Sequence, residues 1–246
     1  MVFSPFLFIY VAICLLLILG LLVLIQLEVI SYAFLVLGLP PKVALLALFV
    51  SLIGSYINIP LYTVDSGPTP VGATANNFGV IYSIPFEYGH GTTVAINVGG
   101  ALVPIFVSVY ALFKTPLALI PSVIGTVIVA IVTHHFAYLL QGVGIAVPLF
   151  IPPLAAALVA LFLGKTMRVS RVAHVIAYVS GSLGTLIGAD LMNLHRIAYL
   201  GAPVASIGGA GTFDGVFLTG IVAILLAGVK EPAPAISSSS SQRLRS

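Results

Sequence analysis

Residues 181–220 read GSLGTLIGADLMNLHRIAYLGAPVASIGGAGTFDGVFLTG. An apolar segment ends at Asp190, a more polar turn follows, and a second apolar segment begins after Asp214. A carboxylate at membrane depth costs on the order of 2.5–3.5 kcal/mol and marks a functional site by default. The stretch therefore predicts two consecutive membrane helices joined by a turn, with both aspartates at a polar site between them.

The composition extends this prediction to the whole chain. Of its 246 residues, 60% are hydrophobic and 6% are charged, whereas a soluble domain carries about 25% charged residues. The chain is therefore expected to be a multi-pass protein of the plasma membrane, with the lipid bilayer as its main partner. A net charge of +3 gives no reason to expect a nucleic-acid partner. The single Cys14 excludes an intrachain disulfide and a cysteine cluster for zinc.

The apolar segments predict an all-α bundle of about seven transmembrane helices, since a span needs about 20 apolar residues. Residues 1–230 are expected to form this single domain, and the Pro- and Ser-rich residues 231–246 a disordered cytoplasmic tail. A connector is expected at residues 31–41 and a long loop at 65–91, of which 78–86 are apolar enough to re-enter the bundle. The predicted spans are residues 5–26, 42–63, 92–113, 116–133, 145–164, 172–191 and 212–229.

The basic residues predict the orientation of this bundle. Alternating sides places eight of the nine Lys and Arg residues on one face and only Arg196 on the other. The positive-inside rule then puts the N-terminus outside and the C-terminus in the cytoplasm. The eight residues are Lys42, Lys114, Lys165, Arg168, Arg171, Lys230, Arg243 and Arg245.

Asp190 and Asp214 are the predicted catalytic residues. Two carboxylates that face each other share a proton, because both cannot ionise at close range. Such a pair suits the general acid–base chemistry of aspartyl proteolysis. The alternative is structural: each aspartate caps a helix end or pairs with His195 or Arg196.

Acidic and histidine residues near the same outer face suggest a metal site as a further alternative. Their side chains suit zinc, but their spacing is irregular and matches no metal-binding motif, so interfacial residues without a metal are the competing interpretation. No other cofactor is expected. The candidate ligands are Asp65, Glu87, His90 and His195.

Residues 97–104 (NVGGALVP) predict a broken third helix. Proline and paired glycines interrupt helical hydrogen bonds, and a broken helix exposes backbone polar groups to a substrate or ion. Close helix packing through small residues is the alternative. The candidate substrate-binding residues here and before Asp214 are Asn97, Gly99, Gly100, Gly209, Gly211 and Thr212.

Three motifs carry a resemblance to a protein family. The stretches TTVAINVGGALVP (92–104), GADLMNL (188–194) and GGAGTFDGVFLTG (208–220) resemble signatures of DUF1614, a family of prokaryotic membrane proteins without an assigned activity. The resemblance covers roughly residues 64–229.

The chain also resembles the GxGD intramembrane aspartyl proteases, which place one aspartate late in a helix and a second early in the next, after Gly-x-Gly. Here Thr212 and Phe213 separate Gly209-Ala210-Gly211 from the second aspartate, and no Tyr precedes the first. The Pro-Ala-Leu motif of that family is missing, unless residues 100–104 (GALVP) substitute for it, and the predicted sidedness is inverted.

Three functions follow from these patterns. The first is an intramembrane aspartyl protease-like hydrolase acting on a membrane-embedded peptide. The second is a transporter or channel for a cation, protons or a small solute, in which the aspartates bind the cation. The third is a structural subunit of a membrane complex. The sequence shows no convincing internal repeat of the kind that transporters often have, so the hydrolase is ranked first.

Overall fold

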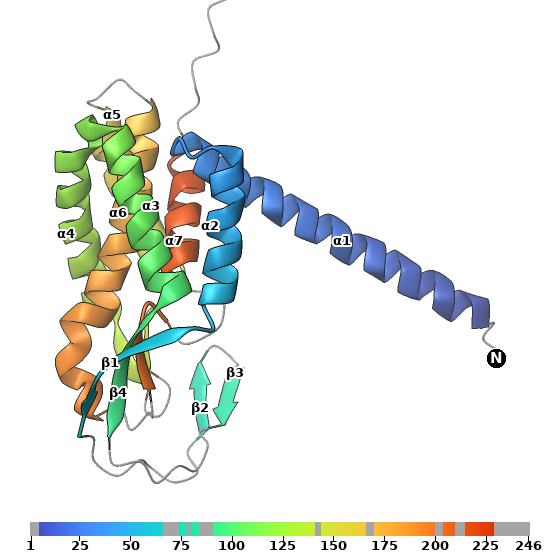
Figure 1. Ribbon diagram of the computed structural model, residues 1–246, viewed down its shortest axis with the longest axis horizontal. Coiled ribbons are helices and arrows are strands. Elements are labelled where there is room, and N and C mark those ends of the chain that lie inside the picture. The colour runs from blue at the N-terminus through green and yellow to red at the C-terminus, as the bar shows by residue number, and fades with distance from the viewer. Residues whose placement is uncertain are drawn as a thin grey trace, which may run out of the picture.

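The computed structural model describes residues 5–65, 74–77, 80–83, 91–140, 144–165, 170–199, 204–209 and 215–228. In this part of the chain there are seven α-helices; α2 to α7 form a bundle, and a small β-sheet covers one end of it (Figure 1). The α-helices are α1 (Pro5–Val36), α2 (Pro41–Gly54), α3 (Val103–Lys114), α4 (Leu119–Phe136), α5 (Ile151–Lys165), α6 (Ser170–Thr185) and α7 (Gly215–Leu226).

Helix α6 lies at the centre of the bundle, where it contacts α3, α4, α5 and α7. Small residues let the neighbouring backbones approach closely. A Cβ added at Gly184 would lie 2.7 Å from the Val129 Cβ, and one at Gly188 would lie 2.3 Å from the Ala130 backbone oxygen. Gly184 of α6 and Gly188, in the π-helical turn that continues α6, are therefore packing positions against α4.

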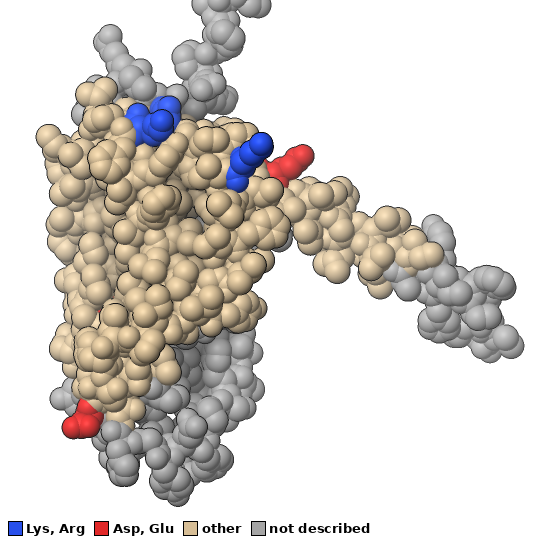
Figure 2. Space-filling model, in the orientation of Figure 1, with Lys and Arg blue, Asp and Glu red and all other residues tan. Residues whose placement is uncertain are grey.

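Three helical segments are long and apolar enough to cross a membrane: Ile13–Val36, Pro116–Phe136 and Arg171–Arg196. The 21 residues of the second segment span roughly 30 Å at about 1.5 Å per residue, which matches the hydrocarbon core of a bilayer. Helix α1 contacts the bundle at its C-terminal end and otherwise projects from it (Figure 1). Figure 2 shows charged side chains at the ends of the bundle and none on the flank between them in this view. These features fit an integral membrane protein in contact with lipid.

The sheet joins distant parts of the sequence in the order β1–β4–β7. Strand β4 (Thr92–Asn97) pairs antiparallel with β1 (Asn58–Val64) and parallel with β7 (Val204–Ile207). Two separate antiparallel pairs are β2 (Thr74–Asn77) with β3 (Val80–Ser83) and β5 (Tyr138–Leu140) with β6 (Gly144–Ala146). The described residues also form two π-helical turns, η1 (Val98–Leu102) and η3 (Leu186–Asp190), and a 3₁₀ helix, η4 (Leu191–Tyr199). A single 3₁₀ turn, η2 (Pro116–Ala118), leads into α4.

The prediction that the protein is mainly helical is confirmed, but several predicted boundaries of the helices are wrong. The predicted connector at 31–41 is partly helical, because α1 continues to Val36. The second predicted span ends at Gly54 rather than at residue 63, and β1 follows it. The third predicted span begins with strand β4 instead of a helix. Apolar, β-branched residues such as Ile59 and Val94 satisfy a hydropathy criterion in either conformation, so hydropathy did not separate strand from helix.

Candidate functional site

Two π-helical turns lie where the bundle meets the sheet. Turn η1 (Val98–Leu102) leads from β4 into α3, and turn η3 (Leu186–Asp190) continues α6 and ends at Asp190. Turns of this kind make up well under 1% of residues and occur frequently at functional sites. Both fall within stretches that the sequence analysis singled out, so this level of the molecule is the candidate site.

Asn97 holds the first π-helical turn in place. Its side-chain oxygen accepts a hydrogen bond from the Gly100 backbone N–H at 2.8 Å, which caps the turn. Its amide nitrogen donates to the Ser55 carbonyl oxygen at 2.8 Å and to the Asn58 side-chain oxygen at 3.0 Å. Asn58 in turn accepts a hydrogen bond from the Ser206 hydroxyl. One buried amide therefore joins η1, α2 and β1, and Asn58 extends the connection to β7.

The end of α2 packs directly on the same turn. The Ser51 hydroxyl donates to the Gly99 carbonyl oxygen at 3.0 Å. A Cβ added at Gly99 would lie 2.0 Å from the Ser51 backbone oxygen and 2.4 Å from the Ser55 nitrogen. Glycine is needed at this position because no side chain fits between the two backbones.

Asp190 connects the second π-helical turn to the end of the sheet. Its Oδ2 atom accepts a hydrogen bond from the Gly208 backbone N–H at 2.8 Å, and its side chain is half-buried. Gly208 has a φ of +93°, and a Cβ added there would lie 2.7 Å from the Ala101 nitrogen. The contacts of Gly208 thus bring residues of all three quoted stretches together: η1, the end of η3 and the turn after β7.

A small apolar cluster lies at the same level as these contacts. It is formed by Val94, Ala101, Leu186, Ile207 and Val216. These residues come from β4, η1, η3, β7 and the first turn of α7. The cluster packs the start of α7 together with the two π-helical turns and the sheet through buried apolar side chains.

The structure describes some of the predicted site residues and leaves others out. Asp190, Asn97, Gly99, Gly100 and Gly209 lie at the junction of bundle and sheet, and the polar side chain of Asn97 is occupied by internal hydrogen bonds. Of the other predicted site residues, Gly211, Thr212 and Asp214 lie outside the described residues.

The predicted metal ligands are likewise only partly described. Asp65 and His195 are exposed, and the described residues contain no group of three or more His, Cys, Asp or Glu side chains that could hold a metal ion. Glu87 and His90 lie outside the described residues, so the full set of four stays a prediction.

The sequence analysis did not single out Ser51, Ser55, Asn58 or Ser206 as site residues. Asn58 is the polar residue at the start of β1, paired in register with Asn97. That pairing depends on a strand contact between residues 39 positions apart, for which the single sequence gave no signal.

The comparison with known families supports the sequence resemblance. The family model described as "Protein of unknown function (DUF1614)" matches residues 52–226. The chain belongs to the DUF1614 family. All three quoted stretches lie within the matched region, so the converging elements described above are features of the DUF1614 part of the chain. No curated protein and no solved structure matches it.

Proposed function

We propose that the protein is an intramembrane aspartyl hydrolase that cleaves membrane-embedded peptides, with Asp190 and Asp214 as the catalytic pair. The observation that supports this most is the hydrogen bond between the Gly208 N–H and the Asp190 carboxylate. It ties the end of η3 to the segment that leads to Asp214, the residue directly before α7. Val216, in the first turn of α7, belongs to the same buried cluster as Leu186, which supports a position of the start of α7 near η3.

The likeness to GxGD proteases adds a second support. In this proposal, residues 100–104 substitute for the Pro-Ala-Leu motif that the chain otherwise lacks, and this segment includes Ala101, which lies close to Gly208. Gly208 thus contacts both the late-helix aspartate and the segment that leads to Pro104, which supports a site built from these parts.

In the proposed reaction, one carboxylate is ionised and the other is protonated, because two close carboxylates share a proton. The ionised carboxylate removes a proton from water while the oxygen of that water attacks the peptide carbonyl carbon. The protonated carboxyl donates its proton to the carbonyl oxygen. The tetrahedral intermediate then collapses, the C–N bond breaks, and the amine leaves with the proton taken from water.

Replacement of each aspartate by Asn tests this proposal. The purified full-length protein is reconstituted in liposomes together with a membrane protein extract, and new peptide termini are identified by mass spectrometry. We expect the wild type to generate new termini and Asp190→Asn and Asp214→Asn to generate none, with both variants retaining helical circular dichroism. Glu28→Gln is the matched control, because Glu28 is an exposed carboxylate outside the proposed pair and outside the predicted metal ligands. Cleavage that survives in Asp190→Asn would refute the proposal.

A second candidate, conduction of protons or a cation, is favoured by a row of hydroxyls on α4. Ser122, Thr126 and Thr133 lie on one face of the helix, and their buried hydroxyl oxygens have no hydrogen-bond partner among the described residues. A Cβ added at Gly188 would lie 2.9 Å from the Thr133 Cβ, so the row reaches η3. Unsatisfied polar groups inside a membrane bundle mark ion or proton paths.

Proton flux into proteoliposomes separates this candidate from the first. Conduction predicts a flux that Thr133→Val and Asp190→Asn both reduce, without any new peptide termini. A protein that produces termini but carries no flux is a hydrolase and not a channel.

A further inference from the structure

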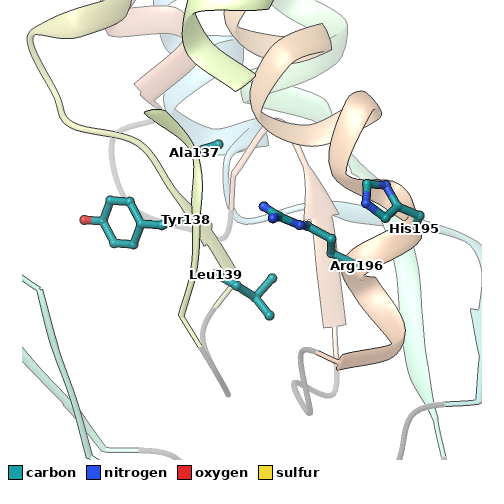
Figure 3. Close-up of a pocket in the computed structure, with 5 residues that line it drawn as sticks. All are labelled: Ala137, Tyr138, Leu139, His195 and Arg196. Carbon is teal, nitrogen blue, oxygen red and sulfur yellow. The ribbon is translucent and has the colours of Figure 1, made fainter. Parts of the chain in front are cut away.

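A groove outside the Asp190 site lies between the end of α4 and helix η4. It has a volume of about 510 Å³ and is lined by Ala137, Tyr138, Leu139, His195 and Arg196. In Figure 3 the Arg196 side chain extends from η4 toward strand β5, whereas the Tyr138 ring points away from Arg196. The groove therefore has one cationic wall and one largely apolar wall.

The lengths of the surrounding helices predict that the groove lies at the boundary of the bilayer. Two of the three membrane-spanning segments, Pro116–Phe136 and Arg171–Arg196, end beside it. A helical segment of 21 residues is about as long as the hydrocarbon core is thick. Residues just beyond its end are at the level of the lipid headgroups, where Arg and Tyr side chains are favoured.

Arg196 is held in position by a hydrogen bond to a neighbouring side chain. One of its guanidinium nitrogens donates to the Asn193 side-chain oxygen at 3.3 Å. Asn193 is itself buried and donates to the Gly188 and Ala189 carbonyl oxygens at 3.0 and 2.9 Å. Within the described ranges, no carboxylate pairs with Arg196. The guanidinium thus keeps donors for a phosphate, which it binds in a bidentate manner.

Apolar side chains next to the groove provide a surface for an acyl chain. Phe136 at the end of α4 and Leu191 and Met192 at the start of η4 are 45, 42 and 39% exposed. A free phosphate ion would leave this apolar surface unused. A phospholipid matches both parts, with its phosphate on Arg196 and its chain along the exposed apolar residues.

We propose that this groove binds the phosphate of an anionic phospholipid through Arg196, with His195 as an additional donor. The groove is separate from the Asp190–Gly208 contact, so the proposal is independent of the hydrolase assignment. Arg196 is the one basic residue that the predicted topology places on the outer face, and this proposal assigns it an anionic partner.

A single introduced tryptophan tests the proposal, because the chain contains no Trp. Tyr138→Trp places a fluorophore at the groove in the full-length protein, reconstituted in phosphatidylcholine vesicles. Phosphatidylglycerol with brominated acyl chains is then added in increasing proportion, and brominated phosphatidylcholine is added in a parallel series. We expect half-maximal quenching at a lower proportion of phosphatidylglycerol than of phosphatidylcholine.

Variants on this background identify the residue responsible. Arg196→Gln should raise the phosphatidylglycerol proportion for half-quenching about tenfold, equivalent to about 1.4 kcal/mol. Arg196→Lys should recover part of the preference, since lysine keeps the charge without the bidentate geometry. Lys114→Gln, which removes an exposed charge at the end of α3, should leave the quenching curve unchanged.

Three results would overturn the proposal. Equal quenching by both lipids would show that the groove does not select an anionic headgroup. An unchanged curve in Arg196→Gln would show that the guanidinium is not the ligand. Relief of quenching by inorganic phosphate alone would show that the site takes a free anion rather than a lipid.

Discussion

Gly208 is the residue at which the sheet, η1 and Asp190 come into direct contact. Its φ of +93° is one that residues with a side chain rarely adopt, and an added Cβ would lie 2.7 and 2.8 Å from the nitrogen and Cβ of Ala101. The left-handed conformation alone costs on the order of 1–3 kcal/mol in a residue with a side chain. Gly208→Ala should therefore lower the free energy of unfolding in detergent by about 2 kcal/mol or more, as measured by denaturant titration.

Gly144→Ala is the control for this prediction. Gly144 also has a positive φ, +150°, but an added Cβ would meet nothing within 4 Å. We expect a smaller loss of stability than at Gly208, because only the backbone conformation is affected. Equal losses in the two variants would show that the contact between Gly208 and Ala101 does not stabilise the site.

At the scale of the elements, Asn97 connects a strand, a π-helical turn and the end of a helix. Asn97→Ala leaves the Ser55 carbonyl and the Gly100 N–H without their partner, and an unsatisfied buried group costs about 1–3 kcal/mol. We predict a loss of unfolding free energy of roughly 2–4 kcal/mol. Ser55→Ala, which keeps the carbonyl that Asn97 binds and removes only the hydroxyl bond to Leu52, should lose less than 1.5 kcal/mol, about one ordinary hydrogen bond. A larger loss of unfolding free energy in Ser55→Ala than in Asn97→Ala would contradict this role of Asn97.

The elements also show what the sequence could and could not predict. The central α6 and the aspartate that follows it were predictable. An apolar segment with small residues and one carboxylate near its end is typical of a membrane helix that leads to a polar site and is rare in soluble proteins. Strands β1 and β4 were not predicted, since their apolar residues suit a buried strand as well as a membrane helix. Their pairing joins Asn58 to Asn97, and β4 pairs with β7 more than a hundred residues later. Contacts at such separations leave no periodic signal in one sequence, so the hydrogen bonds around Asn97 required coordinates.

For the whole molecule, the distribution of charge predicts which end of the bundle faces the cytoplasm. Lys42 in the first turn of α2 and Lys114 in the last turn of α3 mark the end opposite the sheet, whereas Arg196 lies at the sheet end. The positive-inside rule places the lysine-containing end in the cytoplasm. The sheet, the Asp190 site and the Arg196 groove would then face outward, so the outer leaflet would supply the proposed lipid and the proposed hydrolysis would occur near the outer surface.

Single-cysteine labelling of intact cells measures this orientation directly. Cys14 is the only native cysteine, so Cys14→Ser gives a background on which Lys114→Cys and His195→Cys can be compared; both positions are exposed. A membrane-impermeant maleimide should label His195→Cys in intact cells and Lys114→Cys only after the membrane is permeabilised. The opposite pattern would show the reverse orientation and would put the proposed catalytic pair at the cytoplasmic face, where the GxGD proteases cut. Labelling of both positions in intact cells would show that the bundle between them does not cross the plasma membrane, which would contradict the assignment of α4 as a span.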